Sequence, residues 1–299
     1  MAFGGIGNQS PATLFQARLG TSDGVSNILT LGRYQGNKVV VSGLTVPIPS
    51  AGLTRNVADN LIDAAGTDAG APPAASTLYY VYISNHQATF SPSSIRLSSQ
   101  APTLVNGVKY LGSTGDALNW RFVGWVFPNA TPQFESTDTS RTIVNYYNRF
   151  LLKLFTCPGY VDDDTATTYA CDNVTWDQIS KGTGTGGSDS RVTYIANGED
   201  AQSFKCAFEY DNVTSRPGLG GIGIDTPTTA KAQMILATAS ATPECASVFY
   251  DEVGSEQVHT ADIIGMRLSG NFINVVADEA RNGGTKDPFT TYITGTIFG

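Results

Sequence analysis

Residues 119–129 read Asn-Trp-Arg-Phe-Val-Gly-Trp-Val-Phe-Pro-Asn, the densest run of aromatic side chains in the sequence. Alternate side chains of a β-strand point to opposite faces of its sheet. With that period, Trp120 and Phe122 lie on one face and Trp125 and Phe127 on the other, so both faces are apolar. Such a strand must be covered on both sides, and we expect it to be the central strand of the fold, with these four side chains in the core.

Two residues of this run indicate the geometry of the strand. Gly124 predicts a β-bulge or a close approach of another backbone. Pro128 cannot donate a hydrogen bond to a neighbouring strand and therefore marks the end of the strand. Upstream, Thr77–Ser84 reads Thr-Leu-Tyr-Tyr-Val-Tyr-Ile-Ser, which predicts a strand that could pair with the central one and that adds Tyr80 to the core.

The residues on either side predict further short elements. Residues 31–41 read as a hairpin that turns at Gln35-Gly36-Asn37, and Leu44–Ile48 reads as an edge strand because of its prolines. The stretch 140–155 fits both a helical stripe and a strand pattern. Its β-branched and aromatic side chains favour a strand for at least part of it.

The second half of the chain alternates short apolar runs with Gly-, Ser- and Asp-rich turns. Eight strands are expected there, at 191–196, 203–210, 221–225, 232–239, 246–250, 261–268, 271–276 and 290–298. That count is typical of a jelly roll or a similar sandwich. We therefore predict an all-β protein with three parts: an N-terminal docking segment (1–30), a β domain (31–155) and a jelly-roll-like C-terminal β-sandwich (156–299).

Composition limits the classes of partner. Charged residues make up 15% of the chain against about 25% in a typical domain, and the net charge is −8. A nucleic-acid groove needs clustered Lys and Arg, so no nucleic-acid partner is expected. No apolar run approaches the roughly 18 residues of a membrane span. The N-terminus lacks the charged start and apolar core of a signal peptide, which indicates synthesis in a cytoplasm.

The four cysteines, Cys157, Cys171, Cys206 and Cys245, permit two disulfides. Cys157 and Cys171 bracket a polar loop that a disulfide could close. The alternative is four unpaired thiols, which is the usual state in a cytosolic product. None has the Cys-x-x-Cys spacing of a zinc site.

Other candidate chemistry is weak. The Gly-x-Gly-x-x-Gly runs at 182–187 and 218–223 lack the following helix of a dinucleotide site. Two histidines, His86 and His259, limit triads and metal sites, and Asp162–Asp164 lacks the spacing of a calcium loop. The pairs Asp251-Glu252 and Asp278-Glu279 could serve glycoside hydrolysis, although turn acids are the simpler reading. No catalytic residue, cofactor or metal is expected.

Several strands together resemble a module of structural proteins of tailed bacteriophages. The matching runs are Thr77-Leu-Tyr-Tyr-Val-Tyr, Arg121-Phe-Val-Gly-Trp-Val-Phe-Pro-Asn, Gln133-Phe, Asn145-Tyr-Tyr-Asn-Arg and Val46-Pro-Ile-Pro-Ser-Ala-Gly. The closing runs Gly220-Gly-Ile-Gly-Ile-Asp, His259-Thr-Ala-Asp-Ile-Ile-Gly and Ile293-Thr-Gly-Thr-Ile-Phe-Gly are similar to the sandwich that often follows this module. Trp125, Tyr147 and the cysteines depart from its usual pattern.

The resemblance implies a homotrimeric tail-fibre, head-fibre or capsid-decoration protein, located on the virion and made in the host cytoplasm. The N-terminal segment would hold it to other virion proteins, and the sandwich loops would meet the outside, where a host cell-surface glycan is a candidate partner. Tyr160 and Tyr169 are candidate aromatic contacts, because loops on a rigid scaffold carry most contact residues. The alternative is a glycan-degrading spike enzyme that uses paired carboxylates. The position on head, neck or tail, the host and the receptor stay open.

Overall fold

The chain folds almost entirely into β-strands in two compact units. The computed structural model describes residues 14–21, 24–85, 94–156, 168–171, 175–179, 190–211, 218–236, 244–268, 273–276 and 291–299. The first unit comprises residues 1–137, 142–150 and 299, and the second comprises 138–141 and 151–298. The division falls after residue 150 rather than after 155, because β15 (Leu151–Thr156) pairs along its whole length with β25 (Tyr292–Phe298).

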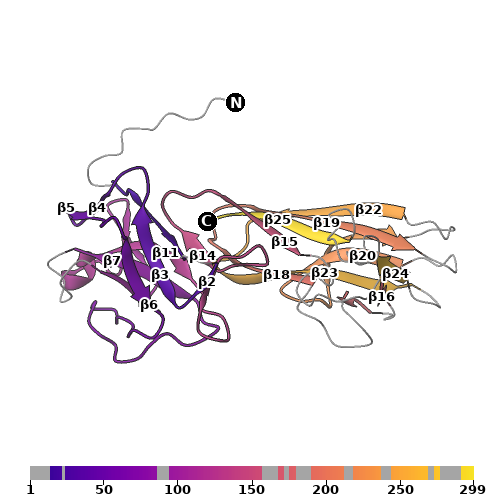
Figure 1. Ribbon diagram of the computed structural model, residues 1–299, viewed down its shortest axis with the longest axis horizontal. Coiled ribbons are helices and arrows are strands. Elements are labelled where there is room, and N and C mark those ends of the chain that lie inside the picture. The colour runs from indigo at the N-terminus through magenta and orange to yellow at the C-terminus, as the bar shows by residue number, and fades with distance from the viewer. Residues whose placement is uncertain are drawn as a thin grey trace. The chain divides into compact units, whose positions relative to one another are not determined.

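The first unit is built around a six-stranded sheet (Figure 1). Its order is β8-β7-β11-β10-β9, and β14 pairs with β11. The bounds are β7 Tyr79–Ser84, β8 Ile95–Ser98, β9 Thr103–Val105, β10 Val108–Tyr110, β11 Trp120–Val126 and β14 Ile143–Asn145, with a 3₁₀ helix (η2, Gly115–Asn119) before β11. All seven residues of β11 are buried, so this strand is covered on both faces.

A bulge changes which aromatic side chains of β11 share a face. Phe122 lies opposite Tyr82 on β7, but the register shifts before Gly124. Trp125 therefore lies on the same face as Phe122, with ring centroids 4.9 Å apart, and the expectation of opposite faces is wrong. Gly124 also permits a close approach, because a Cβ there would lie 2.1 Å from the Val144 carbonyl oxygen.

The core side chains differ in how fully they are covered. Trp120, Phe122 and Trp125 are fully buried, whereas Phe127 and Tyr80 are partly buried. Phe122 and Trp125 also contact Tyr146, at 5.3 and 5.9 Å between ring centroids. The buried aromatic side chains thus form a cluster on the face of the sheet opposite to Val123 and Val126.

The N-terminal strands add three smaller sheets to this unit. They have the order β1-β3-β6 and the pairs β4-β5 and β2-β12. The bounds are β1 Ala17–Gly20, β2 Val25–Ser26, β3 Ile28–Arg33, β4 Lys38–Val41, β5 Leu44–Pro47, β6 Leu53–Asn56 and β12 Phe134–Glu135. The expected hairpin over 31–41 is wrong, since β4 turns into β5 at Ser42-Gly43, whose φ angles of 48° and 80° suit a tight hairpin.

Residues 14–30 are not a loose docking segment, which corrects the expected boundary at residue 30. The guanidinium of Arg121 donates to the carbonyl oxygens of Leu14 and Val40, at 3.1 and 2.5 Å. The Leu19 N–H donates to the Asn145 Oδ1 at 2.7 Å. The Asn148 amide donates to two further carbonyl oxygens of the segment, at 2.9 and 3.0 Å. Side chains of β11, β14 and the segment that follows β14 thus hold residues 14–19 in place.

The second unit is a sandwich of two six-stranded sheets. The first sheet has the order β13-β18-β23-β20-β21, and β17 pairs with β23. The second has the order β15-β25-β19-β24-β16, and β22 pairs with β19. Further bounds are β13 Ser140–Arg141, β16 Thr168–Cys171, β17 Asp177–Gln178, β18 Arg191–Ala196, β19 Gln202–Asp211, β20 Gly218–Ile224, β21 Ala230–Leu236, β22 Glu244–Glu252, β23 Gln257–Arg267 and β24 Ile273–Val276. Rings from the two sheets meet between them, with the Tyr194 and Phe204 centroids 5.1 Å apart.

The connections of this sandwich follow a jelly-roll pattern. The chain passes from one sheet to the other between β18 and β19, β19 and β20, β21 and β22, and β22 and β23. The ambiguous stretch 140–155 contains strands β13, β14 and β15 and no helix. Among the described residues, no helix has the length and apolar character to cross a bilayer.

Candidate functional site

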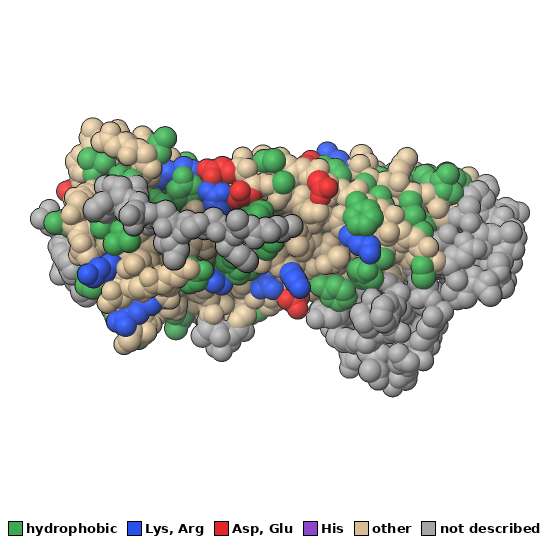
Figure 2. All heavy atoms as spheres, turned by 90° about the horizontal axis from the view of Figure 1, so that it is seen from above, with side chains coloured by type: hydrophobic (Ala, Val, Ile, Leu, Met, Phe, Trp, Pro, Cys, Tyr) green, Lys and Arg blue, Asp and Glu red, His purple; other side chains and the backbone are tan. Residues whose placement is uncertain are grey.

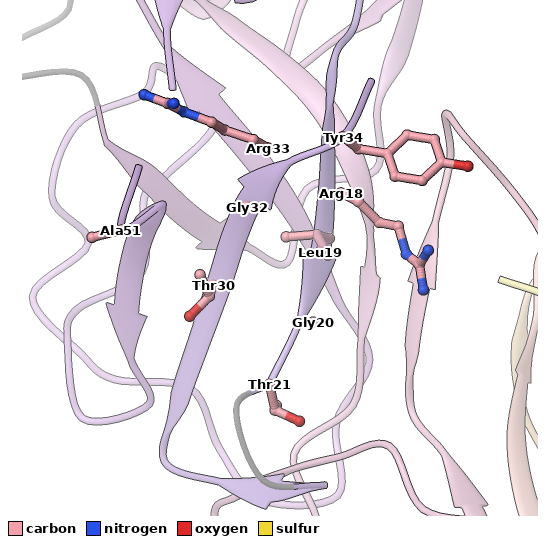
Figure 3. A pocket seen from close by; sticks show the side chains of 9 residues that line it. All are labelled: Arg18, Leu19, Gly20, Thr21, Thr30, Gly32, Arg33, Tyr34 and Ala51. Carbon is pink, nitrogen blue, oxygen red and sulfur yellow. The ribbon is translucent and has the colours of Figure 1, made fainter. Parts of the chain in front are cut away.

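A groove of about 480 Å³ lies over the outward face of β1 and β3 in the first unit. Ala17 and Leu19 point into the core, so Arg18 and Gly20 point outward, opposite Gly32 and Thr30 of β3. Figure 3 shows the Arg18 and Tyr34 side chains side by side, whereas Arg33 extends to the other side. The remaining lining residues are Leu19, Thr21 and Ala51. The floor between the side chains is the bare backbone of two glycines.

Arg18 is the charged group of this groove. Its guanidinium carbon lies 3.5 Å from the centroid of the Phe150 ring and 5.6 Å from that of Tyr34. Partial burial lowers the pKa of the Arg18 guanidinium, and Tyr34 opposes that shift. The cation is thus held by two aromatic faces. Arg33 is engaged elsewhere, since its Nε donates to the Ile48 carbonyl oxygen at 2.8 Å.

A second candidate surface is the outward face of the β15-β25-β19-β22 sheet. The strand registers align Phe155, Thr294, Lys205 and Phe249 in one row across the four strands. The Lys205 ammonium lies 5.7 Å from the Phe249 ring centroid. Figure 2 looks onto the side where Figure 1 places β22, β19 and β25, and hydrophobic side chains there are interspersed with basic and polar ones.

The neighbouring rows of this face carry further apolar and charged groups. Leu151 lies opposite Phe298, and these side chains are 58% and 37% exposed, while Phe249 is 63% exposed. The next row runs from Lys153 at one edge to Asp251 at the other. An outward sheet face with large exposed apolar side chains is typical of an interaction surface rather than of a solvated one.

His259 is buried at one end of the sandwich, where it pairs with the exposed Asp225. The His259 Nδ1 lies 2.7 Å from the Asp225 Oδ2, and its Nε2 lies 3.0 Å from the Ser255 carbonyl oxygen. Both neighbouring oxygens are acceptors, so a ring nitrogen that carries a hydrogen donates to the oxygen it faces. Burial is the main cause that raises the pKa of Tyr194, whose ring stacks on His259 at 5.6 Å. The pair therefore joins β20 to β23 structurally, and its Nε2 faces a carbonyl rather than a nucleophile.

The described carboxylates give no paired acid and base at the expected position. Asp251 and Glu252 are adjacent in β22, so they point to opposite faces of the strand. Asp262 is bound by Arg191, with its Oδ1 2.6 Å from the Arg191 Nε, and burial is the main cause that raises the Asp262 pKa. No group of three His, Cys, Asp or Glu that could hold a metal occurs among the described residues.

Some sequence-based candidates fall within the description and others outside it. Tyr169 and Cys171 lie in β16, so the expectation of a loop position for Tyr169 is wrong. Residues 218–224 form β20 and cannot be a phosphate-binding loop. His86, Cys157, Tyr160, 162–164, 182–187 and 278–279 lie outside the described residues. Cys206 and Cys245 are free, one buried and one exposed.

Sequence reasoning did not find the groove. Its lining comes from β1, β3 and the turn before β6, which are separated in the sequence and meet only through strand pairing. The glycines at 20 and 32 and the outward Arg18 are the available signal, but an isolated alternation of that kind occurs in many strands.

Neither a protein-family model nor a curated protein matches the chain. Among solved structures, one described as the "Structure of infectious bursal disease virus Gx strain" aligns over 96% of this chain and 77% of its own, at 10% identity and a TM-score of 0.24. A Bacillus thuringiensis Cry1Da tryptic core variant aligns over 89% of this chain and 53% of its own, at 8% identity and a TM-score of 0.21. Scores this low carry no argument about function, which is therefore argued from the chain's own residues.

Proposed function

We propose that this protein is a non-enzymatic structural component on the surface of a virus particle, a fibre or decoration protein of a tailed bacteriophage, and that it acts as a homotrimer. The strand motifs that resemble the phage module support the virion context. Trp120–Val126 is the central strand, and Asn145 and Asn148 hold the N-terminal strand in place. These motif residues thus have structural roles, as expected for a scaffold.

The outward face of β15-β25-β19-β22 is the observation that carries the proposal of self-association. Leu151, Phe249 and Phe298 expose apolar area on one sheet face. Lys153 and Asp251 place opposite charges at the two ends of one row. A neighbouring copy would cover the apolar side chains and offer each charge an opposite one.

Sedimentation of the purified chain tests the oligomer. Three chains of 31.6 kDa give about 95 kDa. The double substitution of Leu151 and Phe249 by Asp is expected to shift the mass to that of one chain without lowering the melting temperature. Leu104→Asp, at a 64% exposed position of the first unit, is the matched control and should remain trimeric. A wild-type monomer at micromolar concentration contradicts the proposal.

Labelling of assembled virus particles tests whether this protein is a component of the virion. An antibody against this chain should decorate intact virions at regular positions. Removal of residues 2–13 should abolish incorporation and leave the trimer intact, because the proposed attachment to other virion proteins uses the N-terminal segment. Particles that carry no label, or that incorporate the truncated chain as well as the full one, contradict this part.

The enzyme alternative has less support. A glycosidase needs two carboxyl groups about 5–10 Å apart across a cleft. Asp251 and Glu252 face opposite sides of β22, and no carboxylate is found among the described residues that line the groove of the first unit. Incubation with polysaccharide and assay of new reducing ends tests it directly, and no release above the background of a heat-denatured sample is expected.

A further inference from the structure

Arg18 is a partly buried cation with no anionic partner in the part of the chain that the structure describes. The chain has a net charge of −8, yet the described residues that line the groove include two arginines and no Asp or Glu. Among the described residues, the contacts of the Arg18 guanidinium are with the Phe150 and Tyr34 rings, and it makes no hydrogen bond or ion pair. A guanidinium stacked on a ring still presents its in-plane N–H groups, which fit a carboxylate with two parallel bonds.

The floor beside Arg18 is open to a flat ligand. A Cβ at Gly20 would have no atom within 4 Å, and one at Gly32 would meet only the Arg18 carbonyl oxygen, at 4.0 Å. Thr30 and Tyr34 place hydroxyl groups beside this floor, and the Tyr34 ring adds an apolar surface (Figure 3). The volume of about 480 Å³ lies within the range of small-molecule sites.

From these features we propose that the groove binds an acidic saccharide. The sugar carboxylate pairs with Arg18, the ring lies over the backbone of Gly20 and Gly32, and the sugar hydroxyls bond the hydroxyl groups of Thr30 and Tyr34. One cation, two hydroxyl groups and an aromatic ring match a carboxylated sugar. A phosphate group would call for several converging cations, but Arg33 extends away and donates to the Ile48 carbonyl oxygen.

The inference rests on the proposed virion role only for the source of the saccharide, a host surface. Binding itself is a property of the purified chain. The two proposals therefore fail separately: particles that carry the protein while it binds no saccharide overturn only this inference, and saccharide binding by a protein that never joins a particle overturns only the virion role.

Calorimetric titration of the full chain with trigalacturonate tests the site, with neutral galactotriose and inorganic phosphate as comparison probes. Trigalacturonate is expected to bind and the neutral trisaccharide to bind at least tenfold more weakly, because the latter lacks the carboxylates. Arg18→Gln should weaken trigalacturonate binding about tenfold or more. Lys38→Gln removes an exposed positive charge elsewhere in the unit and should leave the affinity unchanged.

A second variant keeps the test decisive if Arg18→Gln unfolds. Gly20→Val enters open space and so should preserve the melting temperature, while its side chain fills the groove and abolishes binding. Undiminished affinity in both variants overturns the proposal. So does equal affinity for the acidic and neutral trisaccharides, or tighter binding of phosphate that also depends on Arg18.

Discussion

The strands β11 and β25 are each seven residues long and lie inside six-stranded sheets, one in each unit, but they are buried differently. Every residue of β11 is buried, whereas β25 alternates between buried and partly exposed side chains up to the exposed Phe298. A strand covered on both faces can only support the fold. A strand with one outward face can also contact a partner, so the proposed self-association involves the sheet of β25 rather than that of β11.

Truncation of one aromatic side chain in each sheet tests this difference most strongly. Trp125→Ala removes a fully buried ring and is expected to cost about 3–5 kcal/mol, a large share of the stability of a domain. Phe249→Ala removes a ring that is 63% exposed and should change the stability of the isolated chain by about 0.5 kcal/mol or less. Thermal melts of both variants give the comparison. Coincident melts of Trp125→Ala and the parent would mean that β11 is not the centre of the first unit.

The oxidation state and reactivity of the four cysteines compare the inward and outward faces of the sheet that contains β25. We predict that Cys157 and Cys171 are oxidised in mature particles, where a bridge would stabilise by roughly 3 kcal/mol. In the same non-reducing digest Cys245 should be alkylated because it is exposed. Cys206 should be protected, because it lies in the interior and burial raises the pKa of its thiol. Recovery of the Cys157 and Cys171 peptides separately, each alkylated, contradicts the bridge.

Replacement of the buried His259 tests whether polar contacts stabilise this end of the sandwich. His259→Phe keeps a ring against Tyr194 but loses both hydrogen bonds, so a loss of about 1–3 kcal/mol is expected in urea unfolding. Thr226→Val loses an exposed hydrogen bond to Thr228 and serves as the control, with little expected change. Equal loss in the two variants would show that the pair contributes nothing specific.

The smallest expected effect is a pH dependence in the loop beside Trp120. Hydrogen bonds from the side chain and N–H of Thr67 hold the pKa of Asp63 below its ordinary 3.8, and Gly66 of this loop lies against the Trp120 indole. A lowered folded-state pKa gives stability that is present above the unfolded pKa and lost as the pH falls through the folded one. The stability difference between the parent and Asp63→Asn should therefore be constant above about pH 5 and vanish in stronger acid. A difference independent of pH would contradict this role of Asp63.

The sequence predicted where the strands lie better than it predicted which strands pair with each other. The all-β class and the central run at 120–126 follow from side-chain type and alternation. The face of the sheet on which Trp125 lies could not be predicted from the sequence, because the bulge at Gly124 depends on the close approach of Val144. The ordered structure of residues 14–30 could not be predicted either, because the side chains that hydrogen-bond to it, Arg121, Asn145 and Asn148, lie more than 100 positions away.

The candidate sites were less predictable still. Tyr169 looks like a loop residue because its neighbours are polar, but pairing with Val275 places it in a strand. The groove at Arg18 depends on which strands become neighbours, and that is a property of topology rather than of local composition.

The position of β25 between β15 and β19 has a consequence for the order of synthesis. Phe298 pairs with Leu151, and Phe204 on β19 pairs with Gly295, so among the described strands β15 joins this sheet through residues 292–298. A ribosome makes β15 and β19 long before it makes β25. During that interval both strands present unpaired edges, which favour contact between nascent chains. Completion of this sheet is therefore a late event, and chains interrupted before residue 292 are expected to aggregate rather than to persist as folded halves.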